Sequence, residues 1–382
     1  MNSRDRVQLA LNHQEPDRVP FDLGGTGLST IHVTAYQNLR RRLGLPDLEP
    51  RVAFVAEQLV LVDDDLAQHL QTDVRPVLPG TTSSFAYRYR DEGDYRAYTD
   101  EWGIGWRMPK EGGFYYDMYH HPLARADSLD QFKNYPFPNP LDEDRFAPLR
   151  AQAEAAAAKG KAVALAGPCA GIAEVVSWLR GYEQYYIDLA LNQNYVATLL
   201  DRLVEFKSAY WERALAEIGH LVDVVVEADD LGGQNAPLMS PRTYRTLIQP
   251  RHRRLFSFIK EQAPVKVFYH TCGAVRKLIP DLIDAGIDIL NPVQISAAGM
   301  DLRGLKQEFG RDLVFWGGGV DTQGVLGTAT PDQVRAHVRQ NIEALAPGGG
   351  FVFAAVHDIQ ANVPPENILA MWETWQESGQ YS

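Results

Sequence analysis

The sequence predicts an α/β fold, a (β/α)8 barrel of the TIM type that residues 1–382 form as a single domain. Two observations favour it. From residue 151 onward, short apolar runs alternate with longer stretches of helical period, and buried parallel strands are expected to have such unbroken apolar sequences. A doubly wound open sheet is the alternative, but no Gly-x-Gly-x-x-Gly motif opens any of the predicted helices.

The predicted elements begin with a helix over Arg4–Asn12, which Ser3 caps and Pro16 ends. The extended segment Val19–Leu23 is the first predicted strand. Six apolar runs give the further strands: Ala162–Ala166, Val222–Val226, Val265–Tyr269, Ile287–Leu290, Leu313–Trp316 and Phe351–Val356. Seven strands are therefore visible, and the eighth strand of a closed barrel is expected to be too short to detect.

Helices are predicted between these strands and after the last of them, at Val196–Ile218, Arg242–Glu261, Val275–Ala285, Pro331–Leu345 and Pro365–Trp375. Ser240 and Thr330 each precede a proline, and such a pair of N-cap and first-turn residues begins a helix cleanly. Pro250 and Pro280 are expected to kink or divide their helices, because proline has no backbone N–H to donate.

Residues 80–125 interrupt this alternation and are rich in aromatic side chains, often spaced two apart with glycine and aspartate between them. This pattern predicts an antiparallel β-meander inserted into the barrel domain. The insertion would provide an apolar wall for a ligand, a dimer surface or a satellite core. The proline-rich stretch Tyr135–Pro140 marks the end of this region.

The composition excludes several classes of partner. A formal net charge of −12 argues against nucleic acid and anionic membranes, which attract positively charged proteins. No apolar run approaches the roughly 18 residues of a membrane-spanning helix, and the first residues do not resemble a signal peptide. Cys169 and Cys272 are the two cysteines; they give no disulfide framework and favour a reducing compartment, so we expect a cytoplasmic protein. The basic cluster at residues 251–254 is expected to be a solvated helix face rather than an anion site.

Five of the predicted strands end in polar residues. In a parallel barrel these ends open on one face, where enzymes of this fold have their active sites. The residues concerned are Glu227, Asp229, Asp230, His270, Cys272, Asn291, Gln294, Asp321, His357, Asp358 and Gln360. Packing does not require this pattern, so it predicts a catalytic site at that face.

His270 and Cys272 form the most specific chemical motif. Residues i and i+2 of an extended segment project to the same side, so an imidazole and a thiolate can meet one cation, and such ligands suit zinc. A catalytic zinc site usually has three protein ligands, and His357 is the best third candidate, with Glu227 or Asp229 as further choices. The alternative is that both histidines are hydrogen-bonded within the barrel and that Cys272 is a small buried hydrophobic residue.

The remaining polar residues provide candidates for catalysis and substrate binding. Asp229, Asp230 and Asp321 are the candidates for proton transfer, although Asp229 and Asp230 would equally serve as a helix cap and an arginine partner. The candidates for binding a small-molecule substrate are Asp22, Asn291, Gln294 and Gln323. The glycines at 317–319 are expected to allow close approach of the backbone to a ligand, because no lysine or serine follows in P-loop register.

Taken together, these motifs resemble the uroporphyrinogen decarboxylase superfamily, which includes corrinoid-dependent methyltransferases. The resemblance covers nearly the whole chain, and it rests on HQEPDRVPFD, EADDLGGQNAPLMSPRTYRTLIQPRHRRLF, HTCG, DILNPVQ, FWGGGVD and PGGGFVFAAVHDIQANVPPENI. It implies a (β/α)8 barrel with the site inside its C-terminal mouth, in agreement with the pattern of strand ends.

Two chemistries are found in that superfamily. The decarboxylases resemble one another in an arginine-rich motif, PVWxMRQAGRY, that holds the tetrapyrrole, whereas the matching stretch here has no arginine after Arg18. The methyltransferase branch carries zinc on His-x-Cys and a later cysteine. His270 and Cys272 match the first two ligands, but no cysteine follows, and His357 stands in the corresponding late segment.

The resemblance therefore implies a zinc-dependent methyltransferase that moves a methyl group between a small methylated compound, such as a methoxyaromatic one, and a corrinoid or thiol acceptor. Any corrinoid is expected on a separate carrier protein, because the chain has no Asp-x-His-x-x-Gly motif of such carriers. A homodimer is also expected. The alternatives are a metal-free carboxy-lyase similar to uroporphyrinogen decarboxylase and a barrel that only binds a ligand.

Overall fold

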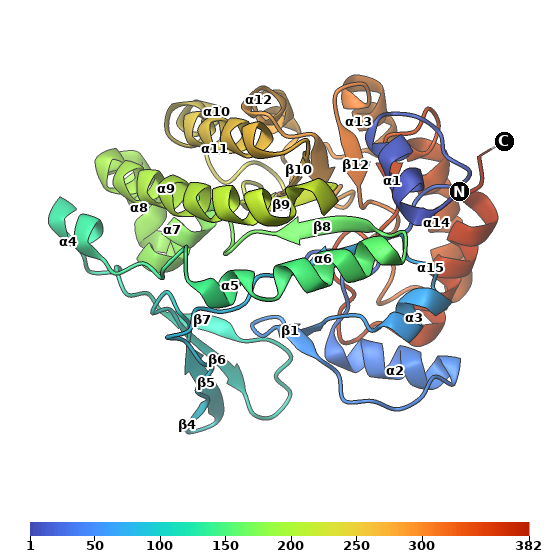
Figure 1. Cartoon of the computed structure of the whole chain (residues 1–382), viewed down its shortest axis with the longest axis horizontal. Coiled ribbons are helices and arrows are strands. Elements are labelled where there is room, and N and C mark those ends of the chain that lie inside the picture. The colour runs from blue at the N-terminus through green and yellow to red at the C-terminus, as the bar shows by residue number, and fades with distance from the viewer. Residues whose placement is uncertain (382) are drawn as a thin grey trace.

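The computed structural model describes residues 1–381, and a curled parallel sheet lies at their centre (Figure 1). Its seven strands follow the order β13-β12-β11-β10-β9-β8-β3, and every neighbouring pair is parallel. The strands are β3 (Val74–Val77), β8 (Ala162–Ala166), β9 (Val224–Ala228), β10 (Lys266–His270), β11 (Ile289–Asn291), β12 (Val314–Trp316) and β13 (Phe351–Val352). The predicted α/β barrel architecture is confirmed.

The segment at residues 19–23 closes the sheet between its two edge strands. Phe21 forms a parallel bridge with Phe353, just beyond β13, and Asp22 N donates to Phe353 O at 2.8 Å. On the other side, the N–H of Asp73, the residue before β3, donates to Phe21 O at 2.8 Å. The strand that the sequence did not reveal is β3, whose short sequence Val-Arg-Pro-Val lacks a continuous apolar run.

Ion pairs fix the closing segment at the amino ends of the strands, opposite the carboxyl ends that carry the predicted site residues. The buried Asp73 carboxylate accepts from Arg6 at 2.8 Å, from Arg18 at 2.7 Å and from the N–H of Phe21 at 2.8 Å. One side chain thus joins the first helix, the closing segment and β3. Both oxygens of the carboxylate accept hydrogen bonds, as a buried charge requires.

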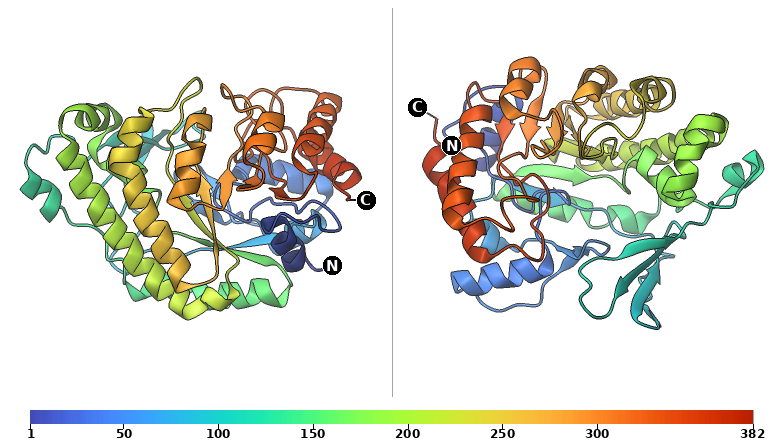
Figure 2. Two further views of the ribbon diagram at one scale, coloured as in Figure 1. Left: turned by 90° about the horizontal axis from the view of Figure 1, so that it is seen from above. Right: turned by 180° about the vertical axis from the view of Figure 1, so that it is seen from behind.

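The helices lie outside the strands, and α9, α11 and α12 are side by side (Figure 2). They are α1 (Ser3–Leu11), α2 (Val33–Leu43), α3 (Asp64–His69), α4 (Leu129–Asn134), α5 (Glu143–Phe146), α6 (Leu149–Ala158), α7 (Ile172–Arg180), α8 (Tyr182–Leu191), α9 (Gln193–Ile218), α10 (Pro241–Thr243), α11 (Gln249–Gln262), α12 (Ile279–Ala285), α13 (Leu302–Phe309), α14 (Pro331–Leu345) and α15 (Pro365–Ser378). None of the helices in residues 1–381 is long and apolar enough to cross a membrane.

The interior of the barrel is an apolar cluster distinct from the main hydrophobic core, and α1 packs against it. Val7, Ala10 and Leu11 of α1 belong to the same buried cluster as inward side chains of the strands, among them Phe268 and Trp316. The prediction that Ser3 caps this helix was wrong. Asn2 is the cap, because its side chain accepts from the N–H of Asp5 at 2.8 Å.

The two internal prolines divide their helices as predicted. The chain makes a π-helical turn at Tyr244–Ile248, and α11 follows with Pro250 in its first turn. A 3-10 turn at Arg276–Leu278 similarly precedes α12, which has Pro280 in its first turn. Proline has no N–H for the preceding turn, so the helical hydrogen-bond ladder is interrupted at both places.

The aromatic-rich stretch contains a four-stranded antiparallel sheet of order β4-β5-β6-β7, which projects from one side of the barrel (Figures 1 and 2). Its strands are β4 (Arg90–Glu92), β5 (Tyr95–Thr99), β6 (Gly105–Pro109) and β7 (Asp117–His120), and a short hairpin of β1 (Val52–Phe54) and β2 (Leu59–Val60) precedes it. The buried Tyr98 and Trp106 rings are 6.3 Å apart, and Trp106 meets Trp178 of α7 at 5.7 Å. These contacts join the insertion to the main hydrophobic core.

A buried charge pair links α9 to β9. Lys207 Nζ lies 2.8 Å from Glu227 Oε2, and both side chains are almost completely buried. Trp211 Nε1 donates to the other oxygen of Glu227 at 2.7 Å. Burial opposes the charge of Lys207, but the Glu227 carboxylate outweighs it and raises the lysine pKa to about 12. The pair therefore stays ionised, and Glu227 is not free to serve as a ligand.

We predict that Lys207→Met lowers the free energy of unfolding by about 3–5 kcal/mol, because it leaves the Glu227 carboxylate buried without its counter-ion. The double variant Lys207→Met/Glu227→Met should recover most of this loss. The half-exposed Arg213 on the same helix is the control, and Arg213→Met should change stability by less than about 0.5 kcal/mol. Urea denaturation measures all three; equal stability of wild type and Lys207→Met would contradict the assignment.

Candidate metal centre

Three of the predicted residues meet at the carboxyl ends of the strands. His270 ends β10, Cys272 follows it by two residues, and His357 lies in the loop after β13. One ligand atom from each of the three lies within 4.8 Å of the other two. The two imidazole rings are 5.4 Å apart and nearly perpendicular. The parallel barrel thus brings together side chains that are 87 positions apart in the sequence (357 − 270).

The hydrogen bonds of Asn291 determine the tautomer of His270. Asn291 Nδ2 donates to the carbonyl of Trp316 at 2.8 Å, so its Oδ1 faces His270 Nδ1, at 2.6 Å. Nδ1 therefore carries the hydrogen, and the lone pair of Nε2 is directed toward Cys272 and His357. Metal-binding histidines commonly have such an outer partner. Burial lowers the pKa of His270 to about 4, which keeps the ring neutral and able to bind a cation.

The spacing and the donor types fit zinc. His270 Nε2 is 3.4 Å from Cys272 Sγ. A tetrahedral ion with bonds of about 2.1 Å to nitrogen and 2.3 Å to sulfur separates two such ligands by about 3.6 Å. Burial raises the pKa of the Cys272 thiol, and the carboxylates of Asp230 and Glu174 add to the rise. A bound cation would reverse this balance by stabilising the thiolate.

Asp230 borders the three candidate ligands. Its Oδ1 accepts from the backbone N–H of Cys272 at 2.8 Å and lies 3.8 Å from His270 Nε2. Its side chain is 43% exposed, so it faces the open mouth of the barrel. Of the three aspartates predicted for proton transfer, Asp230 is the one that borders the candidate ligands.

Asp229 has a different position from Asp230. Its carboxylate is fully buried; Oδ1 accepts from the N–H of Glu174 at 2.7 Å, and Oδ2 contacts His252 Nε2 at 2.7 Å. It therefore caps α7 from another strand, because the N-cap of that helix, Gly171, has no side chain. A Cβ at Gly171 would approach Asp229 Oδ1 to 2.1 Å, so only glycine fits. Asp229 holds α7 in place and does not face the mouth.

The basic cluster at 251–254 is thus not a simple solvated face. His252 is buried and bonds to Asp229, and its Nδ1 lies 3.1 Å from the hydroxyl of Tyr244. Arg251 pairs with Asp201 at 2.7 Å, and Arg253 pairs with Asp284. Sequence reasoning missed the role of His252 because it requires α11 to pack behind β9.

Glu174 is a site residue that the sequence did not reveal. It occupies the first turn of α7, and burial, together with the carboxylates of Asp230 and Asp229, raises its pKa well above the usual range. Within residues 1–381 its carboxylate accepts a single hydrogen bond, a long one of 3.5 Å from Gly171 N. The glutamate three residues after Gly171 was a visible capping signal, but nothing in the sequence placed it beside Asp230.

His357 is bordered by further carboxylates. Its Nδ1 lies 3.4 Å from Asp358 Oδ2, and Asp358 Oδ1 accepts from Thr30 N at 2.7 Å. Burial raises the pKa of Asp358 to about 6, although His357 and Thr30 oppose the rise. Glu57, in the β1–β2 turn, also has its pKa raised by burial, and His357 is among the groups that lower it. The sequence pointed to Asp358 but not to Glu57.

Other predicted residues support the surrounding loops. Asp321 accepts from Gln323 N at 3.0 Å and Gly324 N at 3.1 Å, as the first residue of a turn. Gln294 Oε1 accepts from Gly273 N at 2.7 Å and steadies the loop after Cys272. Gln323 is exposed and accepts from Ser296 Oγ at 2.9 Å. The glycine at 318 has a φ of +81°, so a turn requires it there.

Asp22 lies behind the centre. Its Oδ2 accepts from Trp316 Nε1 at 2.8 Å and from Ser29 Oγ at 2.7 Å, and its Oδ1 accepts from Gly25 N at 2.7 Å. Burial raises its pKa to about 6, although these three donors oppose the rise. The backbone carbonyl of Trp316 also accepts from the side chain of Asn291, which in turn bonds to His270. Hydrogen bonds through Trp316 and Asn291 therefore connect Asp22 to His270.

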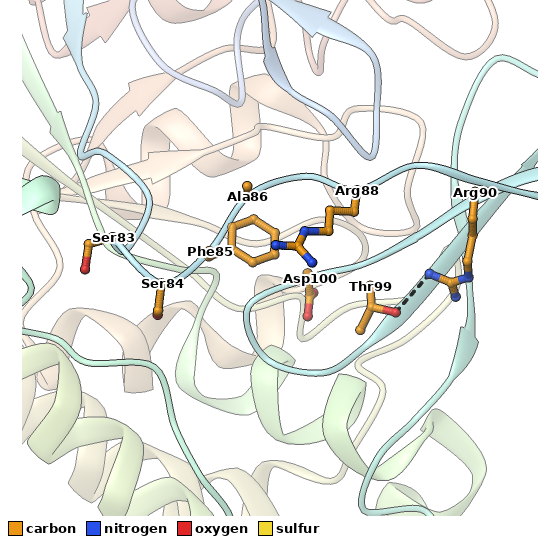
Figure 3. A pocket seen from close by; sticks show the side chains of 8 residues that line it. All are labelled: Ser83, Ser84, Phe85, Ala86, Arg88, Arg90, Thr99 and Asp100. Atoms are coloured by element: carbon orange, nitrogen blue, oxygen red, sulfur yellow. Dashed lines mark hydrogen bonds between the residues drawn. The ribbon is translucent and has the colours of Figure 1, made fainter.

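A separate groove of about 560 Å³ runs along the insertion (Figure 3). Its lining includes Phe85, Arg88 and Asp100, and Arg90 donates to Thr99 Oγ1 there at 3.2 Å. None of the predicted site residues lines it. The candidate centre is therefore defined by its donor atoms and not by this groove.

The uroporphyrinogen decarboxylase (URO-D) family matches residues 103–378. The chain belongs to the uroporphyrinogen decarboxylase family. The match begins inside the insertion and extends through every candidate ligand to α15.

Two relatives are named for different activities, one for methyl transfer and one for decarboxylation. The chain is 25% identical over 214 residues to the methylated-thiol–coenzyme M methyltransferase of Methanosarcina mazei, covering 56% of this chain and 50% of that protein. It is 23% identical over 187 residues to the uroporphyrinogen decarboxylase of Magnetococcus marinus, covering 47% and 48%. The chain thus matches about half the length of these curated relatives.

A solved structure has the same overall fold. A methyltransferase from Methanosarcina mazei is similar over 99% of both chains, with a TM-score of 0.66 and 19% sequence identity. At that identity the likeness shows the architecture alone.

We predict that Asn291→Ala weakens zinc binding by about 10- to 100-fold, because His270 loses the acceptor that orients its ring. Competition with a chelator of known affinity measures the change. Gln323→Ala is the matched control, since that amide is exposed and bonds only to Ser296 in the described chain. Equal affinity of Asn291→Ala and wild type would contradict the role of this hydrogen bond.

We also predict that Asp22 makes stability depend on pH. Its pKa is raised from 3.8 to about 6 on folding, so the folded state binds the proton more tightly. Stability therefore falls as the pH rises through that window, by about 2–3 kcal/mol from this group. Asp22→Asn should flatten this part of the curve, whatever its effect on absolute stability. Urea titrations at several pH values measure it, and an unchanged slope would refute the assignment.

Proposed function

We propose that the chain is a zinc-dependent methyltransferase that moves a methyl group between a small methylated compound and a corrinoid or thiol acceptor. The observation that supports it best is the convergence of His270, Cys272 and His357, with Asn291 holding His270 in the metal-binding tautomer. The similarity to the methylated-thiol–coenzyme M methyltransferase agrees with this function. The corrinoid would be carried by a separate protein.

His270, Cys272 and His357 would hold the zinc ion. Bound there, zinc supplies Lewis-acid chemistry to a thiol, ether or hydroxyl group. Side chains of the protein would supply proton transfer and positioning. Asp230, which accepts from the backbone N–H of Cys272, and Glu174 would exchange a proton with the substrate, and Asp358 borders His357. Asp229 and His252 keep α7, and with it Glu174, in position.

The decarboxylase function has less support. A substrate with many carboxylates needs cationic partners. Arg18, the arginine nearest the corresponding motif, is engaged with the buried Asp73 at the opposite end of the barrel. The charged groups that border the candidate ligands are instead carboxylates, Asp230 and Asp358.

We predict that the purified protein contains about one zinc ion per chain and that Cys272→Ser lowers both the zinc content and methyl transfer by at least about tenfold. Cys169→Ser is the control, because Cys169 packs against the hydrophobic core and should leave both unchanged. Elemental analysis measures the metal, and transfer of a labelled methyl group from methylcobalamin to a thiol measures activity. Zinc well below one per chain, with Cys272→Ser fully active, would refute the proposal. Decarboxylation of uroporphyrinogen, tested in parallel, would favour the alternative.

A further inference from the structure

A basic pocket lies at the end of the barrel opposite the candidate metal centre. It has a volume of about 460 Å³ and is formed between α3 and the C-terminal end of α6, close to the amino ends of β3 and β8 (Figure 1). The cations Arg18, Arg75, Lys159 and Lys161 line it, together with one carboxylate, Asp64. The formal net charge of the whole chain is −12, so this pocket is a local reversal of the overall charge.

Asp64 joins two of these cations. Its Oδ2 lies 2.5 Å from Lys159 Nζ, and its Oδ1 accepts from Arg75. The Asp64 side chain is 66% exposed and is free to turn toward solvent. The Arg75 side chain is only 14% exposed, and the carbonyl of Val62 holds its guanidinium at 3.0 Å. Arg75 and Lys159 can therefore bind one acidic group together, and Arg75 keeps its place if Asp64 moves away.

Lys161 adds a cation that has no counter-ion. Its Nζ donates to the carbonyl of Thr72 at 2.5 Å and to Ser3 Oγ at 3.3 Å. Within residues 1–381, no carboxylate oxygen lies within 4.0 Å of this nitrogen. Burial lowers the pKa of Lys161, Asp73 opposes this effect, and the charge of Arg75 adds to it. An anion in the pocket would relieve the repulsion between these cations.

Arg18 belongs to a separate, balanced group of charges. It lies 2.7 Å from the buried Asp73, which also accepts from Arg6 at 2.8 Å. The other carboxylate that pairs with Arg6 is Asp17, at 2.6 Å. Two cations and two carboxylates thus neutralise one another beneath the pocket, and Asp73 has no charge to spare for Lys161.

The remaining charges determine the kind of ligand that the pocket fits. Arg75, Lys159 and Lys161 share the single carboxylate of Asp64, so two positive charges are unmatched. A phosphate ester carries about two negative charges near neutral pH, and its oxygens accept from donors in several directions. A single carboxylate group would leave one of these cations without a partner.

The rim of the pocket is suited to the uncharged part of such a ligand. Gln68 and Gln71 line it, and both side chains are exposed. Gln71 has a φ of +56° in the turn that ends α3, where glycine is favoured, so its amide is present at a conformational cost. The volume falls within the range of about 300–1,000 Å³ that is usual for small-molecule sites.

We propose that this pocket binds a small phosphate ester, with the phosphate group between Arg75, Lys159 and Lys161 and the polar remainder beside the glutamine amides of the rim. Asp64 takes part of the phosphate position in the free protein and turns to solvent when the ligand binds. The pocket lies at the amino ends of the strands, away from the candidate ligands, so the proposal does not depend on methyl transfer.

Calorimetry in a buffer free of phosphate and sulfate tests the proposal with three probes: glucose 6-phosphate, inorganic phosphate and glucose. Glucose 6-phosphate should bind with a Kd below about 1 mM, inorganic phosphate should bind more weakly, and glucose should not bind. Added sodium chloride should weaken the binding of both phosphates, because salt screens exposed charges. No binding of either phosphate, or equal binding of glucose and glucose 6-phosphate, would overturn the proposal.

Two variants at the pocket change its charge in opposite directions. Asp64→Asn should raise the affinity for glucose 6-phosphate several-fold, because it releases Arg75 and Lys159, and a misfolded protein would not show such a gain. Lys159→Gln should lower the affinity several-fold. An affinity that does not rise in Asp64→Asn, or does not fall in Lys159→Gln, would overturn the proposal.

A similar ion pair on the insertion supplies the matched controls. Lys110 Nζ lies 3.3 Å from Asp91 Oδ2, and both side chains are at least 40% exposed. Asp91→Asn and Lys110→Gln should leave the affinity for glucose 6-phosphate unchanged. Changes equal to those of the pocket variants would mean that net charge alone governs binding, and the proposed site would be wrong.

A lipid headgroup carries the same phosphate chemistry from a different source. The protein should remain in the supernatant when vesicles of phosphatidylcholine and phosphatidic acid are sedimented, because its net charge of −12 is repelled by an anionic surface. Sedimentation with these vesicles that Lys159→Gln abolishes would overturn the assignment of a small soluble ligand.

Discussion

The pairing of β10 with β11 is the constraint on which the candidate centre depends. Its register places Asn291 beside His270, and the hydrogen bond between these two side chains decides which imidazole nitrogen carries the proton. Asn291 is itself oriented by the carbonyl of Trp316 at the end of β12. The indole of Trp316 in turn donates to Asp22 on the segment that closes the barrel. Three adjacent strands and the closing segment thus hold Nε2 of His270, a candidate metal ligand, in place.

A second group of contacts positions the acidic side of the mouth. Asp229 caps α7 because Gly171 has no side chain, and the buried His252 holds the other oxygen of Asp229. Glu174 therefore projects from a helix whose first turn is fixed by a neighbouring strand. The adjacent Asp230 points the opposite way, toward Cys272, because successive residues of an extended chain alternate in direction. Of these two consecutive aspartates, Asp229 thus caps α7 and Asp230 contacts the Cys272 backbone.

Two cations of the barrel take part in ion pairs that the fold itself needs. Lys207 is completely buried in a pair with Glu227, and Arg18 is used at the amino end of the strands to close the sheet. The cations that the fold needs for its own stability are therefore unavailable to a ligand. The groups that border the candidate centre are carboxylates, beside three donors of the kind that zinc binds.

Local sequence patterns were enough to indicate the barrel, most of its strands, the proline-divided helices and the candidate ligands, because unbroken apolar runs and polar strand ends follow from the burial of parallel strands. They also pointed to the His-x-Cys pair, since both residues belong to one extended segment. They did not reveal β3, whose Arg and Pro interrupt its apolar character, or the roles of Glu174, Glu57 and His252. Those roles arise between segments far apart in the chain. Only the closed barrel sets which carboxylate faces the mouth and which is buried behind it, because direction depends on packing between strands and helices and not on neighbours in sequence.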